Sequence, residues 1–257
     1  MRAILDAVIQ AVQIAGKVLC GEPRVLGMGV LPSTSARADA LTCLRESLHP
    51  IHPGCGWLTW QTANTAERLH CDHVWIVAPV IGSDAFVQGT PEPVPVLSVA
   101  LVRHGNPILG AVHNPATAEM FVALRHGGAF LNGRRIFCTE ITETRCAVAR
   151  IGRSRNGMGI CHRMRTVFRD IRPARNTAYQ LALVAAGRSD LYVCRQDRNE
   201  WDVCAGDLLV REAGGDLQFP GGRTRTYNQP DIVLHGGLVA GNEILVTRVL
   251  EQLKPLA

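Results

Sequence analysis

Residues with reactive side chains are spread singly along this chain, and few of them fall into a recognisable chemical pattern. Ser83 follows Gly82, but it lacks the Gly-x-Ser-x-Gly context that exposes a nucleophilic serine on a sharp turn. The histidines show no paired metal-ligand spacing, and no two of the nine cysteines form a Cys-x-x-Cys pair.

The composition is that of a globular protein with a sizeable core. The chain has 257 residues, of which 47% are hydrophobic, 19% charged and 5% aromatic, and this excludes a disordered, collagenous or disulfide-stapled chain. No apolar run approaches the roughly 18 to 20 residues of a membrane helix, and the first residues form no signal peptide. The scattered cysteines are those of a reducing compartment, so the expected location is the cytoplasm.

The positive charge is modest and does not indicate nucleic-acid binding. The formal net charge is +5, and only two of the 27 basic residues are lysines. The basic run from Arg163 to Arg175 is interleaved with apolar residues and lacks aromatic platforms for bases. It therefore predicts an arginine-faced surface helix, with neither nucleic acid nor a membrane as a partner.

The hydrophobic periodicity predicts one continuous α/β body over residues 1–257, with an N-terminal half at 1–145 and a C-terminal half at 146–257. In the first half we expect helices at 3–20 and 35–48, then strands at 57–60, 74–80, 94–102, 108–113 and 120–124, and a last segment at 127–136 that turns at Asn132-Gly133. In the second half we expect strands at 147–151, 191–194, 217–219 and 238–240, and helices at 179–186, 202–213 and 242–252.

Three stretches resemble a known family. They are Val74-Trp75-Ile76-Val77-Ala78-Pro79-Val80-Ile81-Gly82-Ser83, Gly127-Gly128-Ala129-Phe130-Leu131-Asn132-Gly133 and Glu200-Trp201-Asp202-Val203-Cys204-Ala205-Gly206-Asp207. They are similar to the inositol monophosphatase superfamily of Mg²⁺-dependent phosphatases. Tyr227-Asn228-Gln229-Pro230-Asp231 is more similar to its 3'(2'),5'-bisphosphate nucleotidase branch. The resemblance implies an α/β (α+β) fold, layered as an α-β-α-β-α sandwich.

The chain departs from the family pattern at positions that hold metal. The family strand reads Asp-Pro-Ile/Leu-Asp-Gly-Thr, and its two aspartates match Ala78 and Ile81. The Glu-Glu pair of the family matches Trp60 and Gln61, and an upstream aspartate matches Arg37. The four acidic positions now occupied by Arg37, Trp60, Ala78 and Ile81 have therefore lost their carboxylates, as has the neighbouring position of Gln61.

Asp202 is the metal-binding carboxylate of the family that this sequence retains, and the family threonine survives as Ser83. One carboxylate cannot hold Mg²⁺, which prefers to remain hydrated. We therefore expect no metal and no cofactor, and a cleft repurposed for a small organic molecule. The expected reaction is metal-independent, of the cyclase, isomerase or lyase type, with Asp202 as the acid.

Two alternatives remain open at this point. In the first, the chain is a catalytically silent pseudophosphatase in which Arg37 neutralises Asp202, and the fold binds a ligand or a partner. In the second, it retains Mg²⁺-dependent phosphomonoesterase activity on an inositol phosphate or adenosine 3',5'-bisphosphate. Trp60 either fills the old metal cavity or forms a platform for the ligand.

The candidate site is assembled from these positions. The catalytic candidates are Asp202, Ser83 and Asp84. The candidates for substrate binding are Trp60, Gln61, Arg37, Ala78, Ile81, Gly82, Tyr179, Arg198 and Glu200. The expected partner is a small organic molecule, and the resemblance leaves a homodimer as an open expectation.

Overall fold

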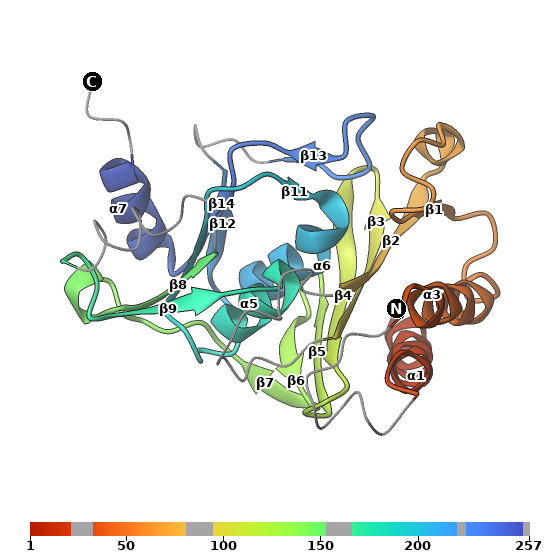
Figure 1. The fold of residues 1–257 in the computed structure, drawn as a ribbon, viewed down its shortest axis with the longest axis horizontal. Helices are drawn as coiled ribbons and strands as arrows, with labels where there is room; N and C mark the ends of the chain where they lie inside the picture. The colour runs from red at the N-terminus through yellow and green to blue at the C-terminus, as the bar shows by residue number, and fades with distance from the viewer. Residues whose placement is uncertain (22–32, 81–94, 153–165, 220–224, 254–257) are drawn as a thin grey trace.

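A computed structural model describes residues 1–21, 33–80, 95–152, 166–219 and 225–253 of the chain (Figure 1). Within these ranges, no helix is long and apolar enough to cross a membrane.

The first half of the chain builds two helices and a seven-stranded sheet. The helices are α1 (Arg2–Leu19) and α3 (Thr34–Leu48). The strands, which lie side by side in chain order, are β1 (Gly56–Leu58), β2 (His73–Val80), β3 (Val96–Arg103), β4 (Asn106–Asn114), β5 (Glu119–Leu124), β6 (Gly128–Leu131) and β7 (Arg134–Ile136). A 3₁₀ turn, η1 (Glu67–His70), connects β1 to β2, which pair in parallel, and the other neighbours are antiparallel.

The second half builds a five-stranded sheet in the order β12-β14-β10-β8-β9. Its strands are β8 (Val148–Gly152), β9 (Asp170–Ala174), β10 (Leu191–Cys194), β12 (Asp216–Gln218) and β14 (Leu238–Gly241). A two-stranded ribbon joins β11 (Arg198–Asn199) to β13 (Val233–Leu234). The helices are α5 (Thr177–Ala185), α6 (Glu200–Glu212) and α7 (Glu243–Leu253), and η2 (Thr144–Cys146) is a further 3₁₀ turn.

These elements stack in five layers (Figure 1). Helices α1 and α3 pack on one face of the seven-stranded sheet through an apolar cluster that includes Val12, Leu44 and Trp75. Helices α5 and α6 fill the space between the two sheets, and α7 covers the outer face of the five-stranded sheet through Leu245 and Val249. The predicted α-β-α-β-α sandwich is therefore confirmed.

Most predicted elements lie where expected, but the basic helix over 163–175 is wrong. Residues 153–165 lie outside the described ranges, and Asp170–Ala174 form the edge strand β9, parallel to β8. Pro173 explains the difference, because proline lacks the N–H of a helix interior and drives the preceding residue, Arg172, toward extended backbone. The charges of this segment therefore line a sheet edge instead of a helix face.

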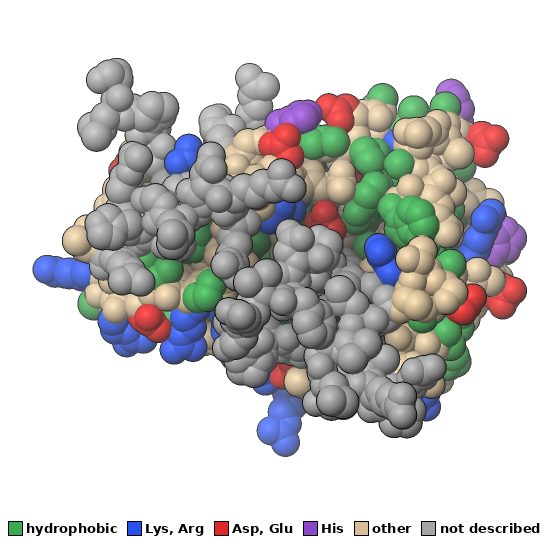
Figure 2. Space-filling model, in the orientation of Figure 1, with side chains coloured by type: hydrophobic (Ala, Val, Ile, Leu, Met, Phe, Trp, Pro, Cys, Tyr) green, Lys and Arg blue, Asp and Glu red, His purple; other side chains and the backbone are tan. Residues whose placement is uncertain are grey.

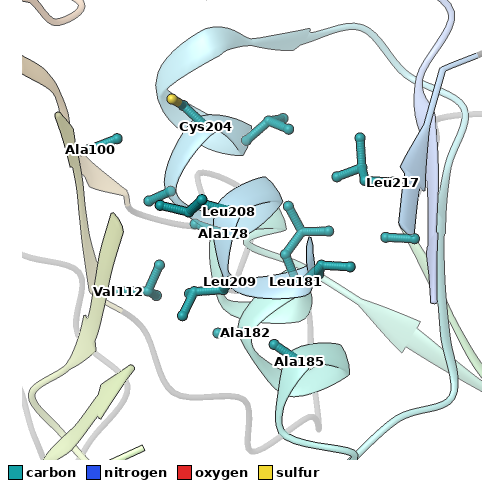
Figure 3. Packing of buried hydrophobic residues seen from close by; sticks show 14 of the residues in the cluster. Ala100, Val112, Ala178, Leu181, Ala182, Ala185, Cys204, Leu208, Leu209 and Leu217 are labelled. Atoms are coloured by element: carbon teal, nitrogen blue, oxygen red, sulfur yellow. The ribbon is translucent and has the colours of Figure 1, made fainter. Parts of the chain in front are cut away.

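Helix α6 approaches its neighbours closely because glycines stand at its contacts. A Cβ placed on Gly206 would lie 2.6 Å from the Cβ of Leu181 on α5, and one on Gly110 of β4 would lie 2.9 Å from the carbonyl oxygen of Ala205. Figure 3 shows Leu208 and Leu209 of α6 within this packed layer, between Val112 of β4 and the residues of α5. Ala205 and Gly206 thus determine how closely α6 packs against β4 and against α5.

The substitution Gly206→Ala tests this contact. The added methyl group collides with a side-chain atom next to the backbone of α5, so we expect the free energy of unfolding to fall by about 1–3 kcal/mol, as for other overpacked cores. Urea denaturation measures it. Since Leu181→Ala makes room for the methyl group, the double variant is expected to lose less than the sum of the two single losses. Additive losses would show that the contact does not limit packing.

Candidate functional site

Asp202 lies in the first turn of α6 and caps that helix. Its Oδ2 accepts a hydrogen bond from the backbone N–H of Asn199 at 3.2 Å, while the Asn199 side chain bonds back to the helix in a capping box. Burial raises the pKa of the Asp202 carboxyl group, while the Asn199 N–H and the positive charge of Arg198 oppose that rise. Asp202 is therefore an acid held in one orientation at the positive end of the helix dipole.

Arg198 supplies a fixed positive charge beside Asp202. Its Nε donates to Thr177 Oγ1 at 2.8 Å, its Nη1 to the carbonyl oxygen of Asp197 at 3.0 Å, and its Nη2 to Gln196 Oε1 at 3.2 Å. Thr177 is the first residue of α5, so this arginine joins the N-terminal ends of α5 and α6. The arrangement favours an anionic ligand near these two helix ends.

Trp60 and Arg37 form a second part of the candidate site. Trp60 follows β1 and is 41% exposed, and the guanidinium carbon of Arg37 lies 5.8 Å from the centre of its ring. This is a cation–π contact. Gln61, the next residue, is exposed. Arg37 therefore contacts Trp60, whereas the charge that acts on Asp202 among the described residues is that of Arg198.

Three other predicted site residues point inward. Ala78 is buried within β2, and Tyr179 is buried on α5 with its hydroxyl group donating to Glu119 Oε2 at 2.6 Å. Glu200 is fully buried, and its carboxylate accepts the backbone N–H groups of Asn228 and Gln229 at 2.6 and 2.9 Å. The structure thus places Tyr179 and Glu200 in internal networks instead of on an open cleft wall.

A contact that the sequence did not reveal, between Arg68 and Asn228, accompanies Glu200. Arg68, in η1, is 3% exposed, and its Nη1 donates to Asn228 Oδ1 at 2.6 Å. Burial raises the pKa of Glu200 to about 7, while the N–H groups of Gln229 and Asn228 and the charge of Arg68 act against the rise. The sequence did mark the Tyr227–Asp231 segment, but nothing in it connected Asn228 with an arginine 160 residues earlier.

Glu119 is the centre of another network that sequence reasoning missed. Besides the Tyr179 hydroxyl group, its carboxylate accepts bonds from Thr117 Oγ1 at 2.8 Å and from Arg188. Burial opposes ionisation of Glu119, but the bonds from Tyr179, Arg188 and Thr117 outweigh it and lower the pKa of the carboxyl group. Tyr179 also packs edge-on against Phe121, so the network fixes α5 on the seven-stranded sheet.

Four predicted residues, Ser83, Asp84, Ile81 and Gly82, lie outside the described residues. At the position of the first turn of α6, Figure 2 shows acidic and basic side chains together, with hydrophobic side chains beside them toward β2 and β3. The described part of the site therefore combines the carboxyl group of Asp202 in the capping box of α6, the hydrogen-bonded guanidinium group of Arg198 and the exposed ring of Trp60.

The chain belongs to the inositol monophosphatase family, whose model matches residues 29–254. It is 32% identical to an inositol-1-monophosphatase of Mesorhizobium japonicum, over 98% of this chain and 96% of that protein. It is 34% identical to an inositol-1-monophosphatase of Rhizobium meliloti, over 97% and 95%. The crystal structure of the extragenic suppressor protein suhB from Bartonella henselae superimposes with a TM-score of 0.79 at 29% identity, covering 98% of each chain.

These similarities correct two expectations. The expectation of lost phosphatase activity and of a cyclase-, isomerase- or lyase-type reaction is wrong, since relatives of nearly equal length at 32–34% identity are named as phosphatases. The expectation that the chain has no metal cofactor is also contradicted, because the family is Mg²⁺-dependent. That this chain lies nearest the 3'(2'),5'-bisphosphate nucleotidase branch of the superfamily stays a prediction.

The described side chains do not fit a Mg²⁺ ion by themselves. Mg²⁺ requires oxygen ligands in near-octahedral geometry. The methyl group of Ala78 and the ring of Trp60 supply none, and Asp202 contributes one carboxylate. In the ranges that the structure covers, no three His, Cys, Asp or Glu residues are grouped so that they could hold a metal. Family membership and the described donor set thus disagree at this point.

The Glu119 network gives an expected pH dependence. Because the folded state lowers the pKa of Glu119, the network stabilises the fold above the ordinary glutamate pKa, and this stabilisation is lost as the pH falls through the folded pKa. At pH 7, Glu119→Gln is expected to lower the free energy of unfolding by about 1–3 kcal/mol, since it weakens hydrogen bonds to a charged group. Below about pH 4 the difference from the wild type is expected to shrink.

Denaturant unfolding at several pH values measures this. Glu46→Gln, an exposed change on α3, is the matched control and is expected to leave the unfolding midpoint within error at each pH. A loss for Glu119→Gln that does not shrink as the pH falls below about 4 would contradict the role assigned to its charge.

Proposed function

We propose that this protein is a phosphomonoesterase that releases inorganic phosphate from a small polyol phosphate, with inositol 1-phosphate as the first substrate to test. The observation that carries the proposal is the similarity, at 32–34% identity over nearly the whole length, to proteins named inositol-1-monophosphatase. In this reaction the oxygen of water forms a bond to phosphorus while the bond to the ester oxygen breaks. The products are an alcohol and phosphate.

The described residues support an anionic substrate at the N-terminal ends of α5 and α6. The helix dipoles and the charge of Arg198 attract a phosphate group. Asp202 uses Oδ2 for its capping bond, and its side chain is held in place for contact with water or with the ligand. Trp60 offers an exposed apolar face, which suits the carbon ring of a polyol. The proposal assigns ligand contact to Asp202, Arg198 and Trp60.

The decisive experiment measures phosphate release from inositol 1-phosphate with Mg²⁺ present, and again after a chelator. We expect release by the wild type and a fall in kcat/KM of at least about 100-fold for Asp202→Asn, the lower end of the effect of removing a carboxylate that acts in the reaction. Adenosine 3',5'-bisphosphate is assayed beside it, because its release rate decides between the two substrate classes.

Asp39→Asn is the matched control, since it makes the same chemical change at an exposed position of α3. It is expected to retain the wild-type rate. Equal rates for the wild type and Asp202→Asn would overturn the role assigned to Asp202. Lack of release from either substrate by the wild type would overturn the proposal.

Two further expectations accompany the proposed activity. A cytoplasmic location stays a prediction, as does assembly into a homodimer, which light scattering on the purified protein would test.

A further inference from the structure

The chain around residues 226–234 wraps the N-terminal end of α6. The backbone N–H of Glu200 donates to the carbonyl oxygen of Ile232 at 3.0 Å, next to the pairing of β11 with β13. Farther along α6, the hydroxyl group of Tyr227 donates to Asp207 Oδ2 at 2.8 Å. The helix end that carries Asp202 is therefore held by bonds from a segment more than twenty residues later in the chain.

Asn228 connects this wrapping segment with η1. Its backbone N–H donates to the Glu200 carboxylate, while its side-chain Oδ1 accepts Arg68 Nη1 and its Nδ2 donates to the Arg68 carbonyl oxygen at 3.0 Å. Arg68 Nη2 also donates to the carbonyl oxygen of Gln229 at 2.9 Å. We call these residues, Arg68, Asn228 and Glu200, the α6 clamp.

Burial constrains the clamp. Glu200 is fully buried and Arg68 is 3% exposed, so both side chains depend on hydrogen-bond partners within the protein, Asn228 and Gln229, for the interactions that water would otherwise provide. Asn228 adopts a φ of +61°, a left-handed conformation that asparagine tolerates better than most residues. Displacing any one member leaves a buried polar group without its partners.

The clamp joins the two parts of the candidate site. Arg68 lies in the 59–70 segment, which follows β1 and carries Trp60 and Gln61, and its Nη2 also lies 3.5 Å from the carbonyl oxygen of Ala63 within that segment. Glu200 begins α6, two residues before Asp202. A bond network thus runs from the segment with the exposed aromatic ring to the helix turn with the acid.

We propose that Arg68 and Asn228 are positioning residues, which hold the 59–70 segment and the first turn of α6 at a fixed separation. They touch no ligand and act through Trp60, Gln61 and Asp202. The inference rests on the proposed phosphatase function for its catalytic consequence, whereas its structural consequence is measured without any substrate.

The test compares Asn228→Gly with Asn228→Asp in the full-length protein. The glycine variant accepts the left-handed backbone but loses both side-chain bonds, whereas the aspartate variant keeps the acceptor for Arg68. For Asn228→Gly we expect amide hydrogen exchange to become about tenfold faster or more at residues 59–70 and 200–203. We also expect kcat to fall by about 10-fold or more, with a smaller change in KM, because misplaced groups slow the reaction. Asn228→Asp is expected to keep most of the wild-type kcat and most of the wild-type protection from exchange at residues 59–70 and 200–203.

Asn242→Gly is the control for general destabilisation. It removes the side chain that accepts the Ile244 N–H at the start of α7, in the outermost layer, and leaves the clamp intact. It is expected to change neither kcat nor exchange at 59–70. Wild-type exchange in both segments of Asn228→Gly, or equally faster exchange along the whole chain, would overturn the positioning role. Faster local exchange together with a wild type that releases no phosphate would support the clamp and overturn the proposed function alone.

Discussion

The close packing of α6 against the seven-stranded sheet and against α5 is the constraint on which the rest of the structure depends. Gly110 and Gly206 leave no room for a side chain at these two contacts, so the helix axis is fixed by backbone and side-chain atoms on both sides. Asp207, buried on the same helix, accepts a hydrogen bond from the hydroxyl group of Tyr227 in the 226–234 segment, and this bond constrains the rotation of α6 as well. With α6 in place, Asp202, Arg198 and the wrapping segment have defined positions.

The fold was largely predictable from the sequence because the helices and strands of its layers show the expected periodicity of hydrophobic residues. The helix α1 shows its apolar face at spacings of three and four, and β2 is a short continuous apolar run, as expected for a buried strand. The Asn132-Gly133 dipeptide predicts the turn between β6 and β7, and both residues have the positive φ that such a turn requires. The apolar spacing of the basic run favours a helix, but Pro173 is incompatible with a helix interior and the segment forms β9.

The candidate site was less predictable, and the reason is physical. Positions matched to the family gave Asp202, Trp60 and Arg37, but a matched position carries no information on burial or on hydrogen-bond partners. Glu200 and Tyr179 are polar residues near the right elements, yet both face inward because partners distant in sequence, Asn228 and Glu119, satisfy them. Such pairs become visible only when the chain is folded.

The edge strand β9 has a consequence for how copies of this protein meet. A sheet edge with free N–H and C=O groups invites a strand from another molecule, which is a common route to aggregation. Pro173 removes one N–H from β9, and the exposed Asp170 and Arg172 of the strand form an ion pair at 3.0 Å. An incoming strand would therefore lose one hydrogen bond and would have to cover a hydrated ion pair, which disfavours continuing the sheet at this edge.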